Sequence, residues 1–242
     1  MKRFFTLFTL MLVAAVAVAQ EDYKGANLYF EPEQMPDMKL FLPGPPAEGS
    51  VEFSNDLAIY ELGKQIRQQD KEAAAAAQAQ SDNRLANLCK QFSAPFGIEI
   101  SEHNTPQIYL LLRDGVITCV KSIIGPKEHY KRIRPFAYHK EGTLMPDREG
   151  MLHQNGSFPS GHTLRGWATA LLLMEVNPDN AEQLLSLGYQ YGQSRVISGY
   201  HWQSDVDASR LVAAAAVAKL HTSPRFIKQM KRAKREYRRL TR

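Results

Sequence analysis

Residues 157–173 read SFPSGHTLRGWATALLL, a polar segment with a proline followed by an apolar, helix-favouring stretch. Pro159 interrupts any helix upstream, and Ser160 can cap a new helix that begins directly after it. We therefore predict that a helix begins at Ser160. Its first turn carries Gly161 and His162, so unpaired backbone N–H groups, a hydroxyl and an imidazole meet at one helix start.

Helical patterns dominate the rest of the chain as well. Alternating strand patterns are scarce, there is no internal repeat, and the loop 135–159 is the main irregular segment. The sequence therefore predicts an all-α fold, a single compact helical domain over 51–224. The first predicted helix is capped by Ser54 and directs Leu57, Ile59, Leu62 and Ile66 toward the core. A Thr105-Pro106 pair is predicted to cap a helix over 107–122. The other predicted helices lie over 73–79, near 85–92, over 160–173, from Asn177 to about Ser194, and over 203–221.

The chain has 242 residues, of which 44% are hydrophobic and 23% charged, enough to bury a core of its own. This composition excludes collagen-like, largely disordered and disulfide-scaffold proteins. Its two cysteines, Cys89 and Cys119, cannot form a four-thiolate metal site. They fall on different predicted helices, and both a disulfide and a pair of buried free thiols stay open.

The first 19 residues are predicted to be a signal peptide. Lys2 and Arg3 precede an apolar run from Phe4 that ends in small residues, the pattern of a cleavable secretory signal cut after Ala19. The run is short for a membrane anchor, and no later segment reaches a spanning length. We expect a periplasmic or secreted protein with no transmembrane span in its mature form, which begins with an extended, Pro-rich arm over 20–50.

The formal net charge of +5 is unevenly distributed along the chain. Cleavage of the signal peptide removes two positive charges, and the basic tail over 225–242 holds nine basic residues and one acid, Glu236. Residues 20–224 therefore carry a net charge of −5, which gives no indication of specific nucleic-acid binding. Apolar residues near helical spacing in the tail favour a helix that is solvated, docks on the body or lies on an anionic surface.

Three segments carry residues suited to phosphate chemistry. At the helix start described first, the Ser160 hydroxyl, the free N–H groups and the helix dipole favour an anion. Gly161 allows close approach to the backbone, and His162 lies in the same turn. Pro-Ser-Gly is also an ordinary helix start, so this segment alone leaves both interpretations open.

The second segment runs from Ser194-Arg195 to His201 and Asp205. His201 and Asp205 are four residues apart, so on a helix they face the same way and can form a hydrogen bond. A carboxylate on one imidazole nitrogen fixes the tautomer and leaves the other nitrogen as a nucleophile or base. A helix-start aspartate beside a structural histidine is the alternative. Arg195 adds a planar donor fork that suits phosphate.

The third segment, KEHYKRIRP, begins at Lys127. Lys127, Arg134 and Arg195 would supply three cations for one dianionic group. Phosphoryl transfer needs little beyond charge neutralisation, positioning, a nucleophile and an acid. Lys131 and Arg132, by contrast, are predicted to lie on a solvated basic helix face.

Together these segments resemble the three-part pattern of the type 2 phosphatidic acid phosphatase superfamily, with eleven fixed positions matched in order: Lys-x6-Arg-Pro, Pro-Ser-Gly-His and Ser-Arg-x5-His-x3-Asp. The wider resemblance, over most of the mature chain, is to the bacterial class A non-specific acid phosphatases. One departure is Phe158, where the class usually has tyrosine. The resemblance also covers LPGPP at 42–46, GSV at 49–51 with Asn55-Asp56, RIRPF at 132–136 and HWQSDVD at 201–207.

The resemblance implies an all-α fold of the acid phosphatase and vanadium haloperoxidase type, and a metal-independent acid phosphatase without a cofactor. It implies that His201 becomes phosphohistidine, that Asp205 orients it, and that His162 is the general acid and base. Its substrates would be small phosphomonoesters, nucleotides among them, and the protein would be a homo-oligomer with an acid-side, bell-shaped pH profile. The phosphate-binding residues implied by the resemblance are Lys127, Arg134, Ser160, Gly161 and Arg195.

Three alternative functions stay open at the level of sequence. A lipid or isoprenoid pyrophosphate phosphatase shares the fold, although such relatives usually carry several membrane spans. A vanadate-dependent haloperoxidase shares the pocket. A non-catalytic anion-binding protein would use the basic tail, although the His201–Asp205 pair and His162 argue against it.

Overall fold

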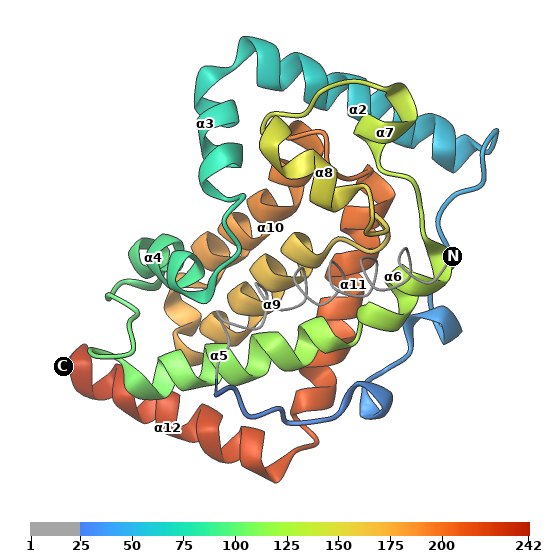
Figure 1. The fold of residues 1–242 in the computed structure, drawn as a ribbon. Coiled ribbons are helices and arrows are strands. Elements are labelled where there is room, and N and C mark those ends of the chain that lie inside the picture. Colours follow the sequence, from blue (N-terminus) through green and yellow to red (C-terminus); the bar gives the residue numbers. More distant parts are fainter. Residues whose placement is uncertain (1–24) are drawn as a thin grey trace, which may run out of the picture.

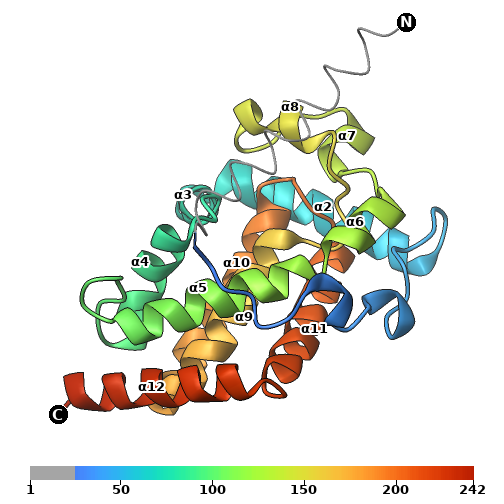
Figure 2. The ribbon, with the colours of Figure 1, turned by 60° about the horizontal axis from the view of Figure 1, so that its bottom comes forward.

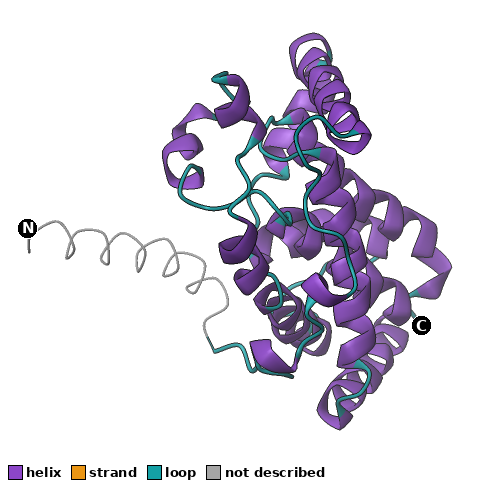
Figure 3. Cartoon of the chain, turned by 90° about the vertical axis from the view of Figure 1, so that its right-hand side faces the viewer, coloured by secondary structure: helices purple, strands orange, loops and turns teal. Residues whose placement is uncertain are grey.

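The computed structural model describes residues 25–242, and the predicted signal peptide with its cut after Ala19 lies outside them. The regular elements in this range are all helices (Figure 3), which confirms the all-α prediction. Within the same range, no helix combines the length and the apolar character needed to cross a membrane. In chain order the elements are η1 (Pro32–Gln34), η2 (Met38–Leu40), α2 (Val51–Gln69), α3 (Lys71–Ala79), α4 (Leu85–Phe96), α5 (Pro106–Lys121), α6 (Ile124–Tyr130), α7 (Pro135–His139), η3 (Pro146–Arg148), α8 (Glu149–Leu152), α9 (Gly161–Val176), η4 (Pro178–Asn180), α10 (Ala181–Ile197), α11 (Gln203–Leu220) and α12 (Pro224–Leu240).

Helix α9 occupies the centre of the molecule and contacts α10, α11 and α5 (Figure 1, Figure 2). Gly166 lets α9 and α10 approach closely, because a Cβ at this position would lie 2.4 Å from the Cβ of Tyr191. Leu164, Ala168 and Leu172 of α9 are fully buried in the same core. The start of α9, which carries the predicted anion-binding residues, is therefore held in place by packing along the rest of the helix.

Helix α2 begins earlier than predicted and buries a different face. Ser50, and not Ser54, is its N-cap, and the Ser50 hydroxyl accepts from the Phe53 N–H at 3.0 Å. Leu62, predicted to face the core, is 53% exposed. The apolar pattern misleads here because one of the inward positions is an aspartate that is buried as part of an ion pair. The buried positions of α2 are Phe53, Asp56, Tyr60 and Gly63.

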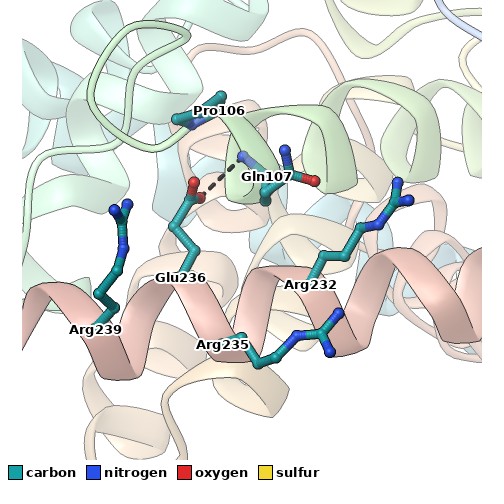
Figure 4. Close-up of a pocket in the computed structure, with 6 residues that line it drawn as sticks. All are labelled: Pro106, Gln107, Arg232, Arg235, Glu236 and Arg239. Carbon is teal, nitrogen blue, oxygen red and sulfur yellow. Dashed lines mark hydrogen bonds between the residues drawn. The ribbon is translucent and has the colours of Figure 1, made fainter.

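Helix α5 begins at the predicted place, but its free N–H groups are capped from a distant part of the chain. Thr105 occupies the N-cap position without accepting a hydrogen bond from the helix. Instead, one carboxylate oxygen of Glu236 accepts from the N–H groups of Gln107 and Ile108, at 2.9 Å each, and Figure 4 shows the bond from Gln107. A carboxylate at this end of a helix also interacts favourably with the helix dipole. The contact joins the start of α5 to α12.

The basic tail forms most of α12, a continuous amphipathic helix that packs against α5 (Figure 2). Phe226, Met230 and Ala233 are buried on its inner face. The arginines 232, 235 and 239 line an open groove around the inward-turned Glu236 (Figure 4). The tail therefore docks on the body through its apolar face and presents its positive charges outward.

Two segments expected to be irregular contain short helices. Residues 25–50 carry η1 and η2 and are tied to α5, where Asn27 donates its N–H to Asp114 and Tyr29 donates its N–H to Thr118, both at 3.1 Å. The loop predicted over 135–159 contains α7, η3 and α8. Short helical turns of this length have no apolar periodicity that a sequence pattern could reveal.

Both cysteines, Cys89 and Cys119, are buried free thiols. Burial raises the pKa of each to about 12, so both are protonated and unreactive at ordinary pH. The sequence left open a disulfide and a pair of buried free thiols, and the structure has the free thiols.

Replacing Gly166 by alanine should destabilise the fold, because the added methyl group would collide with Tyr191 across the α9–α10 contact. We expect the free energy of unfolding to fall by about 1–3 kcal/mol, measured by urea denaturation. Gly142→Ala is the matched control, since nothing lies within 4 Å of the position its Cβ would take. Equal stability of the two variants would contradict a close approach of α9 and α10 at this point.

Candidate active site

His201 and Asp205 meet at the start of α11, as their spacing predicts. The Asp205 carboxylate lies 3.2 Å from Nδ1 of His201 and accepts from the Trp202 N–H at 2.9 Å. Both side chains are buried, with exposed fractions of 3% and 0%. Nε2 of His201 lies 3.1 Å from the Arg134 guanidinium, which can only donate, so Nε2 holds the lone pair and Nδ1 the proton. His201 is thereby held in the tautomer whose Nε2 can attack an electrophile.

Arg132 belongs to this arrangement, and the prediction that it lies on a solvated face was wrong. Its guanidinium bridges Asp205 and Asp56, with an N–O distance of 2.6 Å to each. Ser204 completes the cluster by donating both its hydroxyl and its N–H to Asp56. Arg132 is buried because two carboxylates that would be costly to bury unpaired surround it. Lys131 next to it is exposed, as predicted.

Two further cations, Arg134 and Lys127, are anchored by backbone carbonyl groups. Nε of Arg134 donates to the carbonyl oxygens of Leu152 and Asn155 at 3.0 Å each, and Nζ of Lys127 donates to that of Gly156 at 2.7 Å. Burial lowers the pKa of Arg134 to about 10. Burial also lowers the pKa of Lys127 well below its ordinary value, and the charge of Arg134 lowers it further. The two cations therefore lie close enough to repel each other.

Arg195, in the last turn of α10, is buried with part of its guanidinium unpaired. It is 2% exposed, and its Nε and Nη1 have no hydrogen-bond partner among residues 25–242. Its guanidinium carbon lies 4.8 Å from the centre of the Tyr200 ring. Burial, with the repulsion of Arg134 acting in the same direction, lowers the pKa of Arg195 to about 9. A buried guanidinium with free donors is an incomplete arrangement that an anion would satisfy.

Ser160 caps α9 and joins it to α11. Its hydroxyl oxygen accepts from the N–H and the hydroxyl of Thr163, at 3.4 and 2.9 Å, so its own proton is available to another acceptor. The Ser160 N–H donates to the Asp205 carbonyl oxygen at 3.2 Å. The N–H groups of Gly161 and His162 lie in the first helical turn and are not used within the helix. The start of α9 therefore offers several donors next to the histidine–aspartate pair.

His162 is held by a backbone carbonyl rather than by a carboxylate. Its Nε2 lies 2.9 Å from the carbonyl oxygen of Ser81, in the turn between α3 and α4. Because a carbonyl oxygen only accepts, Nε2 carries a proton, and Nδ1 is the nitrogen left to exchange one. Burial lowers the pKa of His162 well below its ordinary value, and the charges of Arg195, Arg165 and His201 lower it further. The two imidazoles therefore lie within electrostatic reach of each other.

All the site residues predicted from the sequence thus surround the adjoining starts of α9 and α11. A family model described as PAP2 superfamily matches residues 108–228. The chain belongs to the PAP2 superfamily. This PAP2 protein is 45% identical over 213 residues to a non-specific acid phosphatase of Providencia stuartii, a match that covers 88% of this chain and 85% of the relative.

Two other relatives of this PAP2 protein match over comparable lengths. It is 34% identical over 238 residues to a non-specific acid phosphatase of Salmonella typhimurium, which covers 98% of this chain and 93% of the relative. It is 33% identical over 201 residues to an acid phosphatase of Zymomonas mobilis, which covers 83% of this chain and 75% of the relative. These similarities confirm the resemblance to the bacterial non-specific acid phosphatases.

The sequence patterns did not indicate three charged residues that the structure places at or beside this candidate site: Asp56, Arg132 and Arg165. Asp56 and Arg132 both lie in stretches that resemble the class, but no spacing rule indicates that residues 76 positions apart will pair. Arg165 lies three residues after His162 and is 8% exposed.

Phe158, the departure from the class, is buried and packs edge-on against the Tyr130 ring at 5.3 Å between ring centres.

Replacing Arg132 by methionine should leave the carboxylates of Asp56 and Asp205 buried without their shared cation. We expect the free energy of unfolding at neutral pH to fall by about 3–5 kcal/mol, measured by denaturant unfolding. Lys39→Met is the control, because its ion pair with Asp37 has side chains 37% and 40% exposed and should contribute less than about 1 kcal/mol. Similar losses in the two variants would show that the cluster around Arg132 is not structural.

Proposed function

We propose that this acid phosphatase hydrolyses phosphomonoesters through a phosphohistidine on His201, with His162 as general acid and base and without a metal ion. The observation that carries the proposal is the buried, partly unpaired guanidinium of Arg195 near a histidine–aspartate pair. Burial lowers the pKa of His201 well below its ordinary value, and the charges of Arg134, Lys127 and Arg195 lower it further. A phosphate dianion is the ligand whose charge and geometry suit these cations.

In the first step, the lone pair on Nε2 of His201 attacks phosphorus, and the bond between phosphorus and the leaving oxygen breaks. His162 enters this step doubly protonated, and the leaving oxygen takes the proton from its Nδ1, which leaves the neutral ring with its proton on Nε2. Positive charge develops on the imidazole of His201, and the Asp205 carboxylate stabilises it through Nδ1–H. The cations and the N–H groups at the start of α9 neutralise the remaining phosphate oxygens.

In the second step, water attacks the phosphorus of the phosphohistidine. Nδ1 of His162 takes a proton from this water, and Nε2 of His201 departs with the electron pair of its bond to phosphorus. Inorganic phosphate is released, and both imidazoles return to their starting protonation states. The cycle uses only groups of this chain and water.

The pH dependence of turnover should report the low pKa of His162. Its protonated form is the acid, so activity falls as pH rises through that pKa, while the neutral His201 keeps its lone pair down to acid pH. Bound phosphate adds negative charge beside the ring and raises the pKa of His162 in the complex. We therefore expect the alkaline limb of log kcat at higher pH than that of log kcat/KM, measured in pH–rate profiles. Coincident limbs would argue against His162 as the acid.

The proposed roles of the two histidines should be distinguishable with p-nitrophenyl phosphate, because its leaving group needs no proton. His162→Ala should release about one equivalent of nitrophenolate in a burst and then turn over slowly, because only its second step lacks a base. His201→Ala should show neither burst nor turnover, a loss of about 10³-fold or more in kcat. Stopped-flow absorbance measures both. His221→Ala is the matched control, since His221 is a partly exposed histidine paired with Glu175.

Retention of the burst in His201→Ala would assign the nucleophile to another residue.

Turnover should also be unchanged by EDTA, and a loss of turnover that added metal restores would contradict the metal-independent reaction. Circular dichroism of each variant checks that the fold is intact.

We propose further that the protein acts on a broad range of small phosphomonoesters, including nucleotides, as a periplasmic or secreted homo-oligomer. The relatives' description as non-specific supports the broad substrate range, and the basic, then apolar, N-terminal sequence supports export. The homo-oligomer is proposed from the resemblance to the class alone. A hydrolysis panel of phosphomonoesters, diesters and pyrophosphates with EDTA present tests the substrate range. N-terminal sequencing of the exported chain tests the cut after Ala19, and light scattering tests the oligomeric state.

A further inference from the structure

A fourth cation lies at the start of α9 and is not part of the three-part motif. Arg165 follows Gly161 by four residues, and its Nη1 donates to the Gly161 carbonyl oxygen at 3.3 Å. Long side chains on a helix point back toward its N-terminus, which is where this guanidinium lies. Nη1 is 3.4 Å from the place that a Cβ on Gly161 would take. The guanidinium of Arg165 therefore adjoins the backbone predicted to bind phosphate.

Arg165 is buried without an acidic partner in the described part of the chain. Its exposed fraction is 8%, and its Nε is buried with no hydrogen-bond partner there. Burial is the main cause of the low pKa of both His162 and Lys127, and the positive charge of Arg165 lowers each further. Arg165 thus acts electrostatically on the acid and on a phosphate-binding cation while keeping donors of its own unused.

The positive charge of the site exceeds what one phosphate group neutralises. The ion-pair cluster around Arg132 contains one cation and two carboxylates, a net of −1. With four cations near the two histidines, the site has a net charge of about +3 before substrate binds, and a phosphate dianion leaves about +1. The four cations are Lys127, Arg134, Arg165 and Arg195.

We propose that Arg165 forms a subsite for a second anionic group, so that the protein accepts substrates whose leaving group is itself a phosphate, such as a nucleoside diphosphate. This proposal rests on the phosphatase activity proposed above. Nε2 of His201 attacks the terminal phosphorus, and the bond to the bridging oxygen breaks. The departing phosphate keeps the electron pair of that bond and takes a proton from Nδ1 of His162. The planar guanidinium fork suits two oxygens of that phosphate.

The test compares ADP with p-nitrophenyl phosphate, because only ADP places a second phosphate beside the scissile one. Arg165→Met should lower the ratio of kcat/KM for ADP to kcat/KM for p-nitrophenyl phosphate by about 10- to 100-fold, the contribution of a charge-assisted hydrogen bond. Arg165→Lys keeps the charge and should restore part of the ratio. If Arg165→Met does not fold, Arg165→Gln and Arg165→Lys decide the question.

Arg238→Met is the matched control for a general loss of positive charge. Arg238 is an exposed arginine in the last turn of α12, outside the site. This variant should change the substrate ratio less than about threefold. An unchanged ratio in Arg165→Met, or an equal change in Arg238→Met, would overturn the subsite. A wild-type protein that releases phosphate from neither substrate would instead contradict the proposed phosphatase function.

Discussion

The buried carboxylate of Asp205 holds together the parts of the chain that form the site. Its side chain is fully buried and accepts from Arg132, from the Trp202 N–H and from Nδ1 of His201. Its backbone carbonyl accepts from the N–H of Ser160. One residue therefore fixes the start of α11, the start of α9 and the segment before α7 relative to one another. Because a carboxylate is costly to bury, these partners are required for the fold as well as for the proposed chemistry.

Around the other cations of the site, buried positive charge lacks negative partners. Arg132 has two carboxylates, whereas Lys127, Arg134 and Arg195 are held by carbonyl oxygens or keep unused donors. Placing like charges in a low dielectric destabilises the empty site, and the lowered pKa of Arg195, due first to burial and then to Arg134, is one sign of this. An anionic ligand would convert that unfavourable energy into binding energy. On the proposed function, the site would therefore gain its affinity from charges that the fold leaves uncompensated.

The sequence predicted those features that depend on local spacing and missed those that depend on distant contacts. The helix start at Ser160 and the contact between His201 and Asp205 follow from spacings of a few residues, and the structure has both. The cap of α5 could not be predicted, because Glu236 lies 129 residues from Gln107.

Buried charge was the other source of error. The inner face of α2 includes Asp56, which an apolar periodicity treats as an outward position. Arg132 and Arg165 were assigned no role because a charged residue is by default exposed. Arg132 is buried through Asp56 and Asp205, partners that tertiary packing brings to it. Arg165 is buried against its own helix, where it donates to the carbonyl oxygen of Gly161, four residues earlier.

The two histidines differ in the partner behind each ring, and this difference fits the distinct roles proposed for them. His201 has a carboxylate on Nδ1, so a positive charge formed on its ring in the proposed attack on phosphorus would be stabilised at once. His162 has a neutral carbonyl on Nε2 and cations nearby, so its ring loses a proton readily and regains one only when negative charge is close. A nucleophile needs a carboxylate partner that stabilises the positive charge formed on its ring. A group that gives up a proton and takes it back needs a neutral partner such as the carbonyl behind His162. Exchanging the carboxylate and carbonyl partners would leave both residues in place and remove the distinction on which the proposed reaction depends.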